Sequence, residues 1–243
     1  MAQIIKKQNF QSNNPQKPTP IFPIIGFLLI LAGIGLAFAD LLVGTVVLGI
    51  CGVLLLLVGS SRSRFDDSIK RAGDAGESAT AHLISQLPQG YYGFQNLYVT
   101  YEGEQSEIDM VVVGKTGVFI IETKHLNGYV VGNYESRDWI LHKTGRRGGE
   151  YSKEFYSPVK QVGTHVYRLA KFLRSNGVPV TVEAMVFFTH PNTRISVAGQ
   201  QGRIPVYAGQ PGANSLVHNI MSGTANLTTQ QIHSICSLLN QCL

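Results

Sequence analysis

Three charged side chains that could do hydrolytic chemistry, Asp109, Glu122 and Lys124, fall near one end of a predicted β-hairpin. Residues 108–113 and 118–124 are rich in Val and Ile and are joined by a short loop with a glycine at each end, a pattern typical of antiparallel strands. Carboxylates crowded at one place repel each other unless a cation lies between them. Hard oxygen ligands of this kind suit Mg²⁺ or Mn²⁺, which activate water for hydrolysis. A neighbouring lysine can stabilise the charge that develops in such a reaction.

The register of this hairpin decides whether the three groups can meet. If Val113 pairs with Val118, continuing the pairing places Asp109 opposite Glu122. Directly opposed residues of an antiparallel pair point to the same face of the sheet. Lys124 lies two residues beyond Glu122, so the alternation of a strand brings it to that face as well.

A solvated salt-bridge cluster at the edge of a sheet is the alternative interpretation of the same three residues. The neighbouring positions favour burial, because apolar residues occupy both faces of the two predicted strands. Charges placed within such strands are costly unless they are paired or bound to a metal ion.

Two charge-free runs near the N-terminus predict a membrane anchor. Residues 21–39 and residues 41–58 contain no charged side chain, and each run has the length that a helix needs to cross a bilayer. Two such runs with only Asp40 between them favour a transmembrane helical hairpin over buried core helices. Basic residues flank both outer ends, among them Lys6 and Arg62, so we expect both termini in the cytoplasm and a multi-pass protein of the cell (inner) membrane.

The rest of the chain predicts an α/β fold. Residues 1–20 are rich in Gln, Asn, Lys and Pro, which predicts a disordered cytoplasmic tail. The predicted hairpin follows at residues 21–59. We expect residues 60–72 to form a joint and the start of a helix, and residues 73–243 to form one domain. Within it we expect a mixed sheet flanked by helices. The predicted helices are 66–87, one that starts at Pro158 after a Ser cap and stops at Gly177, and one from Thr229; the predicted strands are 93–101, 106–113, 117–124, 128–134, 138–142, 180–188, 194–197 and 204–208.

The charge and the cysteine content say less about the partners of the protein. Residues 60–243 carry 17 Lys and Arg against 14 Asp and Glu, which is compatible with a nucleic-acid partner without demanding one. The three cysteines, Cys51, Cys236 and Cys242, lack the spacing of a metal site, so we expect reduced, structural thiols.

Four short motifs follow one another along residues 73–188: Gly76-Glu77, Glu107-Ile108-Asp109, Glu122-Thr123-Lys124 and Pro158-x-x-Gln161. In combination they resemble the nuclease-related domain known as NERD, which is grouped with the PD-(D/E)xK nuclease superfamily. The resemblance implies a PD-(D/E)xK-like mixed sheet and hydrolysis of nucleic acid, with DNA as the expected substrate and Mg²⁺ or Mn²⁺ as the cofactor.

The resemblance also implies a role for individual residues. Asp109 and Glu122 look like the metal-binding carboxylates, and Glu77 resembles the acidic residue that completes the metal site from the first helix. Lys124 looks like the lysine that positions or activates the attacking water. Gln161 resembles the glutamine on the helix that follows the core strands.

Other residues allow more than one interpretation. Lys143, Arg146 and Arg147 lie in a basic loop that could bind a nucleic-acid backbone, or could be a solvated hairpin tip. His165 lies four residues after Gln161, on the same helical face, where it could reach a phosphate or play a structural part. A nucleic-acid-binding or membrane scaffold module that keeps the fold without the chemistry is the alternative function, and the oligomeric state stays open.

Overall fold

The structure is a computed structural model that describes residues 1–6, 25, 27–32, 42–145, 148–199 and 204–243. Its contacts divide the chain into two units, one formed by Met1–Lys7 with Ala72–Leu243 and the other by Gln8–Arg71. The N-terminal residues therefore belong to the same unit as the C-terminal two thirds of the chain, although about sixty residues separate them in the sequence.

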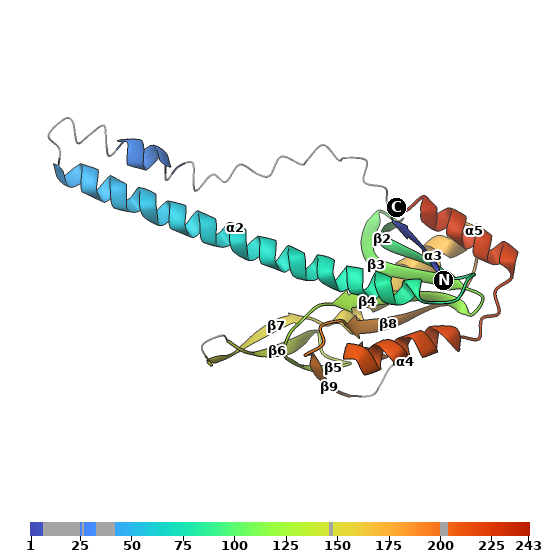
Figure 1. Cartoon of the computed structure of the whole chain (residues 1–243). Helices are drawn as coiled ribbons and strands as arrows, with labels where there is room; N and C mark the ends of the chain where they lie inside the picture. The colour runs from blue at the N-terminus through green and yellow to red at the C-terminus, as the bar shows by residue number, and fades with distance from the viewer. Residues whose placement is uncertain (7–24, 26, 33–41, 146–147, 200–203) are drawn as a thin grey trace. The chain divides into compact units, whose positions relative to one another are not determined.

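A six-stranded mixed sheet forms the centre of the first unit (Figure 1), in the order β1-β2-β3-β4-β8-β10. Its middle strands β2, β3 and β4 are antiparallel, whereas β1 runs parallel to β2, β8 parallel to β4, and β10 parallel to β8. The strands are β1 (Gln3–Lys6), β2 (Tyr92–Tyr101), β3 (Glu104–Gly114), β4 (Gly117–Lys124), β8 (Val182–Phe188) and β10 (Val206–Ala208).

A second, four-stranded sheet has the order β7-β6-β5-β9. Trp139 on β6 is fully buried, and its ring stacks on Phe188 of the central sheet with ring centres 6.4 Å apart. This contact joins the two sheets in one hydrophobic core. The strands are β5 (Tyr129–Asn133), β6 (Asp138–Thr144), β7 (Glu150–Tyr156) and β9 (Arg194–Ala198).

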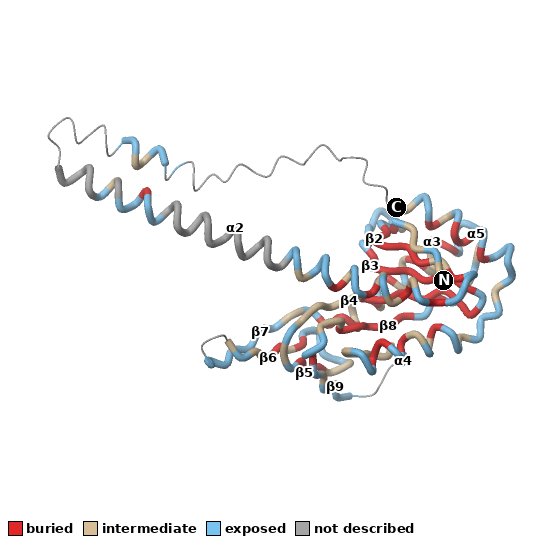
Figure 2. Tube along the Cα trace, viewed as in Figure 1, coloured by how far each residue is buried: buried red, intermediate tan, exposed pale blue. Residues whose placement is uncertain are grey.

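Helices cover both faces of the central sheet. On one face α3 (Pro158–Ser175) and α5 (Thr229–Asn240) pack against buried strand residues that include Val118 and Ile120. On the other face the C-terminal end of α2 (Leu42–Ser85) and α4 (Gly209–Met221) pack against Phe119 and Ile121. Figure 2 shows the central strands as the buried layer between these helices. The apolar residues on both faces of β4 therefore reflect a strand that is covered on both sides.

The strands and helices that the sequence predicts between residues 92 and 208 are present, as are the helices at Pro158 and Thr229. Ser157 accepts a hydrogen bond from the backbone N–H of Lys160, so the predicted cap of α3 is confirmed. Three elements were missed: β1, β7 and α4. Residues 3–6 form a strand where a disordered tail was predicted, because Ile4 and Ile5 pack on opposite sides of the sheet edge.

The start of the domain also differs from the prediction. A joint was expected within residues 60–72, but α2 is one continuous helix from Leu42 to Ser85. Residues 60–72 contain neither Pro nor Gly, so nothing in their backbone chemistry ends the helix. Of the predicted transmembrane hairpin 21–59, residues 21–24, 26 and 33–41 lie outside the described part of the chain. Within the described part, no helix combines the length and the apolar character needed to cross a membrane.

Candidate active site

The register of the β3–β4 hairpin brings Asp109 to the end of β4. Val113 pairs with Val118, as predicted, and the pairing continues to Met110 opposite Ile121, where it stops. Beyond that point a side-chain hydrogen bond takes the place of backbone pairing. Oδ2 of Asp109 accepts a hydrogen bond from the backbone N–H of Thr123 at 2.8 Å. The carboxylate thus binds β4 at the place where the two strands separate.

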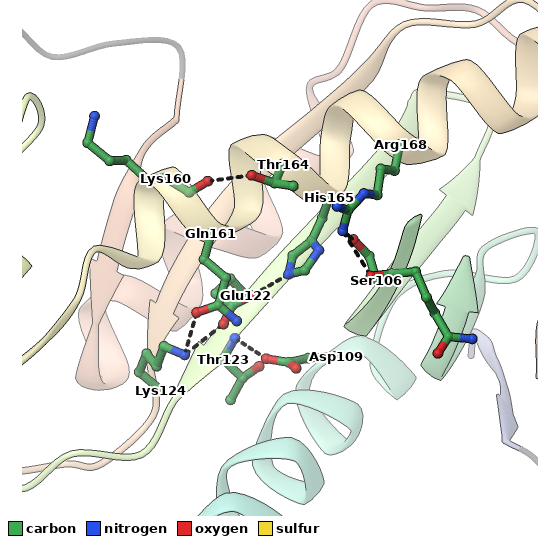
Figure 3. A network of polar contacts seen from close by, with 11 residues as sticks. Ser106, Asp109, Glu122, Thr123, Lys124, Lys160, Gln161, Thr164, His165 and Arg168 are labelled. Carbon is green, nitrogen blue, oxygen red and sulfur yellow. Dashed lines mark hydrogen bonds and ion pairs between the residues drawn. The ribbon is translucent and has the colours of Figure 1, made fainter. Parts of the chain in front are cut away.

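Glu122 and Lys124 are held by the parallel pairing of β4 with β8, and Glu122 is only 1% exposed. Figure 3 shows Lys124 between two acceptors, with its Nζ donating to Oε1 of Glu122 at 2.8 Å and to Oε1 of Gln161 at 3.0 Å. Gln161 comes from the first turns of α3, which crosses this face of the sheet. The structure therefore brings together three of the predicted residues through direct contacts.

His165 lies one helical turn after Gln161 and is also buried against Glu122. Its Nε2 is 3.4 Å from Oε2 of Glu122, close enough for an ion pair if the imidazole is protonated. The geometry does not make a hydrogen bond, however, so among the described residues neither Oε2 of Glu122 nor either ring nitrogen of His165 has a hydrogen-bond partner. A buried carboxylate oxygen without a partner is costly and marks a place where a ligand would be stabilised.

The electrostatics of Asp109 also favour a bound cation. Burial raises the pKa of Asp109 from 3.8 to about 7, with the negative charge of Glu122 as the next cause and that of Glu77 as a smaller one. The hydrogen bond from Thr123 and the charge of Lys124 oppose this rise. Asp109 therefore lies in a field of negative charge that Lys124 compensates only in part.

Glu77 reaches the site from α2 but is held by β2. Its Oε2 accepts a hydrogen bond from Nδ2 of Asn96 at 3.0 Å. Asn96 has a left-handed backbone, with φ of 54°. Neither Asn96 nor Asp109 is paired in the ladder between β2 and β3. The break in the ladder thus turns a side chain of β2 toward α2 beside the Asp109 position.

A glycine allows α2 to approach the end of β4 closely. A Cβ at Gly76 would lie 2.9 Å from Cβ of His125 and 3.2 Å from Cγ2 of Thr123, so only glycine fits here without movement. One turn later, Oγ1 of Thr80 is hydrogen-bonded to Oγ1 of Thr123 at 2.9 Å. The Gly76-Glu77 motif therefore combines a close-packing position with an acidic side chain.

Of the predicted nucleic-acid residues, the structure describes Lys143. Lys143 is on β6, in the second sheet, opposite Tyr151 on β7. It lines a cavity of about 900 Å³ together with Tyr151, Tyr129 and His142. Arg146 and Arg147 lie outside the described residues.

The donor atoms fit a divalent cation in part. Among the described residues, no group of three or more His, Cys, Asp or Glu side chains is arranged to hold a metal ion. The predicted metal ligands Asp109, Glu122 and Glu77 do not form such a group. Glu122 is hydrogen-bonded to Lys124, and Glu77 is hydrogen-bonded to Asn96. What remains is a pair of hard oxygen donors, Asp109 and the unpartnered Oε2 of Glu122, of the kind that Mg²⁺ and Mn²⁺ bind.

Sequence reasoning underestimated His165 and did not find Asn96. The signal for His165 was its spacing of four residues from Gln161, which places both on one face of α3. The left-handed conformation of Asn96 had only a weak signal, the tolerance of asparagine for positive φ.

The chain is similar to a known protein family over the segment that contains the site. Residues 72–189 match the nuclease-related domain, NERD. This NERD match contains all the residues of the site, from Glu77 to His165, and ends before β9. An uncharacterized protein of Bacillus anthracis is 32% identical over 95 residues, which make up 38% of this chain and 44% of that protein. The aligned part is thus less than half of either chain. No solved structure matches the chain significantly.

Proposed function

We propose that this chain is a divalent-metal-dependent nuclease that hydrolyses phosphodiester bonds, with DNA as the expected substrate. The observation that carries the proposal is the convergence of Asp109, Glu122, Lys124 and Gln161 at one end of β4, inside the segment that matches the nuclease-related domain. A buried carboxylate oxygen without a partner, next to a second carboxylate of raised pKa, is the environment that a cation would stabilise.

Each residue has a role that its contacts support. Asp109 and Glu122 would hold Mg²⁺ or Mn²⁺, which supplies a water of lowered pKa and neutralises phosphoryl charge. Lys124 would stabilise the negative charge that develops on the attacking water or on a phosphoryl oxygen. Gln161 fixes the direction of the ammonium group by accepting one of its hydrogen bonds. Glu77 would act at the periphery, since Asn96 already binds its carboxylate.

One observation favours the alternative, a binding or scaffold module that keeps the nuclease fold. Lys124 already supplies a positive charge to Glu122, and among the described side chains no three-residue metal group is preformed. In that case the charged cluster would stabilise the end of β4 without turnover. Cleavage by the full-length protein in Mg²⁺ or Mn²⁺, compared with binding in EDTA, separates the two functions.

We further propose that residues 21–59 anchor the protein in the cell membrane, with both ends of the segment in the cytoplasm. The two charge-free runs in the sequence support the anchor. Pairing of β1 with β2 supports the topology, because Met1–Lys7 and Ala72–Leu243 form one folded unit and must lie on the same side of a bilayer. Any crossing by the intervening chain must then occur an even number of times. Reporter fusions before β1 and after Leu243 should both report the cytoplasm, and opposite sides would refute the topology.

A further inference from the structure

We propose that the outer face of α3 binds the phosphate backbone of nucleic acid. The inference rests on the proposed function and names the surface along which its substrate approaches the site. This surface is the α3 basic row, defined as Lys160, Thr164, Tyr167, Lys171 and Arg174.

The spacing of the α3 basic row places its members on one side of the helix. Steps of four, three, four and three residues keep side chains in line along a helix surface. Fourteen residues at 1.5 Å each give a row roughly 21 Å long. Thr164, Tyr167 and Arg174 are exposed, and Lys160 and Lys171 are half-buried, so the row faces solvent.

Charge on this helix is entirely of one sign. The sequence of α3 contains Lys160, Arg168, Lys171 and Arg174 and no Asp or Glu. Arg168, on the neighbouring side, is neutralised by Glu104 at 3.1 Å and also donates to Oγ of Ser106 at 2.7 Å. The three cations of the row have no carboxylate partner among the residues that the structure describes. They are therefore free to bind an external anion.

The position of Lys160 is not explained by helix stability. Lys171 and Arg174 lie in the last turns, where positive charge stabilises the helix dipole, but Lys160 lies in the first turn, where positive charge is unfavourable. It is also adjacent to Gln161, the partner of Lys124. Figure 3 shows Gln161 extending from α3 toward Lys124 and Lys160 extending away from it. The row thus begins beside the candidate active site.

The C-terminal half of the row borders a groove that has apolar and aromatic groups beside the charged ones. A hollow of about 380 Å³ lies between α3 and residues 179–181, lined by Tyr167, Lys171 and Arg174 over an apolar floor that includes Val166. Tyr167 is 54% exposed, and Nζ of Lys171 lies 5.5 Å from the centre of its ring. Cations beside an exposed aromatic ring are the combination that binds phosphate and sugar or base together.

An anionic membrane surface would also attract these cations. Lys160 is adjacent in sequence to Gln161, the partner of Lys124, and this closeness to the candidate active site favours nucleic acid. Membrane binding by the row is a separate outcome that the experiment distinguishes.

Binding of a fluorescent DNA oligonucleotide to the full-length protein in EDTA tests the inference without cleavage. Lys171→Glu should weaken binding about tenfold or more, whereas the charge-matched control Lys115→Glu, at the exposed residue of the β3–β4 turn, should change it less than threefold. The milder Lys171→Gln/Arg174→Gln variant should lower the slope of log affinity against log salt by about two, one for each lost phosphate contact. Thermal unfolding checks that the variants are folded.

The possible results separate the inference from the proposed function. A Lys171→Glu protein that binds DNA as Lys115→Glu does would overturn the inference, even if the wild type cleaves DNA. Loss of binding to phosphatidylserine vesicles with DNA binding unchanged would assign the row to the membrane and overturn it as well. Loss of DNA binding in a protein that cleaves nothing would support the row and refute the nuclease. A wild type that binds neither DNA nor RNA would refute both.

Discussion

Nζ of Lys124 lies 2.8 Å from Oε1 of Glu122, a carboxylate that is 1% exposed. In the absence of metal this ammonium donates a hydrogen bond to the buried carboxylate, whereas His165 does not. A divalent ion at Glu122 would therefore share the carboxylate with Lys124, and the two cations can be distinguished by experiment.

Replacing Lys124 with Ala should destabilise the metal-free protein by about 2 kcal/mol. This lies between the roughly 1 kcal/mol of an exposed ion pair and the roughly 3–5 kcal/mol for breaking a buried one, since the Lys124 side chain is 24% exposed. Mn²⁺ should raise the melting temperature of this variant more than that of the wild type, because it restores positive charge at Glu122. Turnover should fall by roughly 10²-fold while metal binding persists. Unfolding and cleavage unchanged by the substitution would contradict this role.

Metal binding should strengthen as the pH rises through about 7. Burial and the charge of Glu122 raise the pKa of Asp109 to about 7, so below that pH a proton competes with the metal ion. Calorimetry at pH 6, 7 and 8 should show tighter Mn²⁺ binding at each step, with proton release near pH 7. Asp109→Asn should bind more weakly and lose most of this pH dependence.

The same pKa determines how metal-free stability varies with pH. The folded-state pKa of Asp109 lies above its ordinary value of 3.8, so its contribution to stability is complete below about pH 4 and is lost as the pH rises through about 7. Asp109→Asn should remove this part of the decline.

A wild-type protein whose metal affinity is constant from pH 6 to 8 would show that Asp109 does not bind the ion.

Gln161 should act by positioning Lys124. Gln161→Ala removes the acceptor that lies 3.0 Å from Nζ of Lys124, and we expect kcat to fall about tenfold with KM nearly unchanged. Gln161→Glu keeps an acceptor oxygen and should lose less. Ser175→Ala, at the exposed C-terminal end of α3, removes only a hydrogen bond to a backbone carbonyl and serves as the control. Equal rates for the Gln161→Ala and Ser175→Ala proteins would argue against the role.

Two glycines of α2 should respond in opposite ways to alanine. At Gly73 a Cβ meets nothing within 4 Å, so Gly73→Ala should stabilise the protein by about 1 kcal/mol through helix propensity. At Gly76 the Cβ would meet His125 at 2.9 Å, so Gly76→Ala should destabilise by about 1–3 kcal/mol through overpacking. Denaturant unfolding measures both. A gain in stability at Gly76 would mean that α2 does not pack closely on β4.

The parts of the fold that the sequence predicted are those with a strong local signal. The β3–β4 hairpin combines two β-branched runs with a short loop, so its register could be predicted as far as Met110 and Ile121. The predicted pair of Asp109 and Glu122 is not part of the ladder, and Asp109 instead accepts a hydrogen bond from the backbone N–H of Thr123. Ser157 and Pro158 likewise marked the start of α3.

The missed elements lack such signals. The strand β7 is polar and almost wholly exposed, so it shows no alternation, and α4 begins with glycines and a proline that resemble a loop. Within the site, the function of Gly76 depends on its distance from His125, a tertiary contact that local sequence does not record. The pairing of Lys124 with both Glu122 and Gln161 also required the position of α3 over the sheet.

The central claim is that the cluster at the end of β4 cleaves phosphodiester bonds. It is tested most directly by incubating the full-length protein with DNA and RNA in Mg²⁺, in Mn²⁺ and in EDTA, beside the Asp109→Ala and Glu122→Ala variants. The account predicts cleavage by the wild type with metal, none in EDTA, and none by either variant although both remain folded. Cleavage that survives in either folded variant, or a wild type inert toward all substrates with both metals, would contradict it.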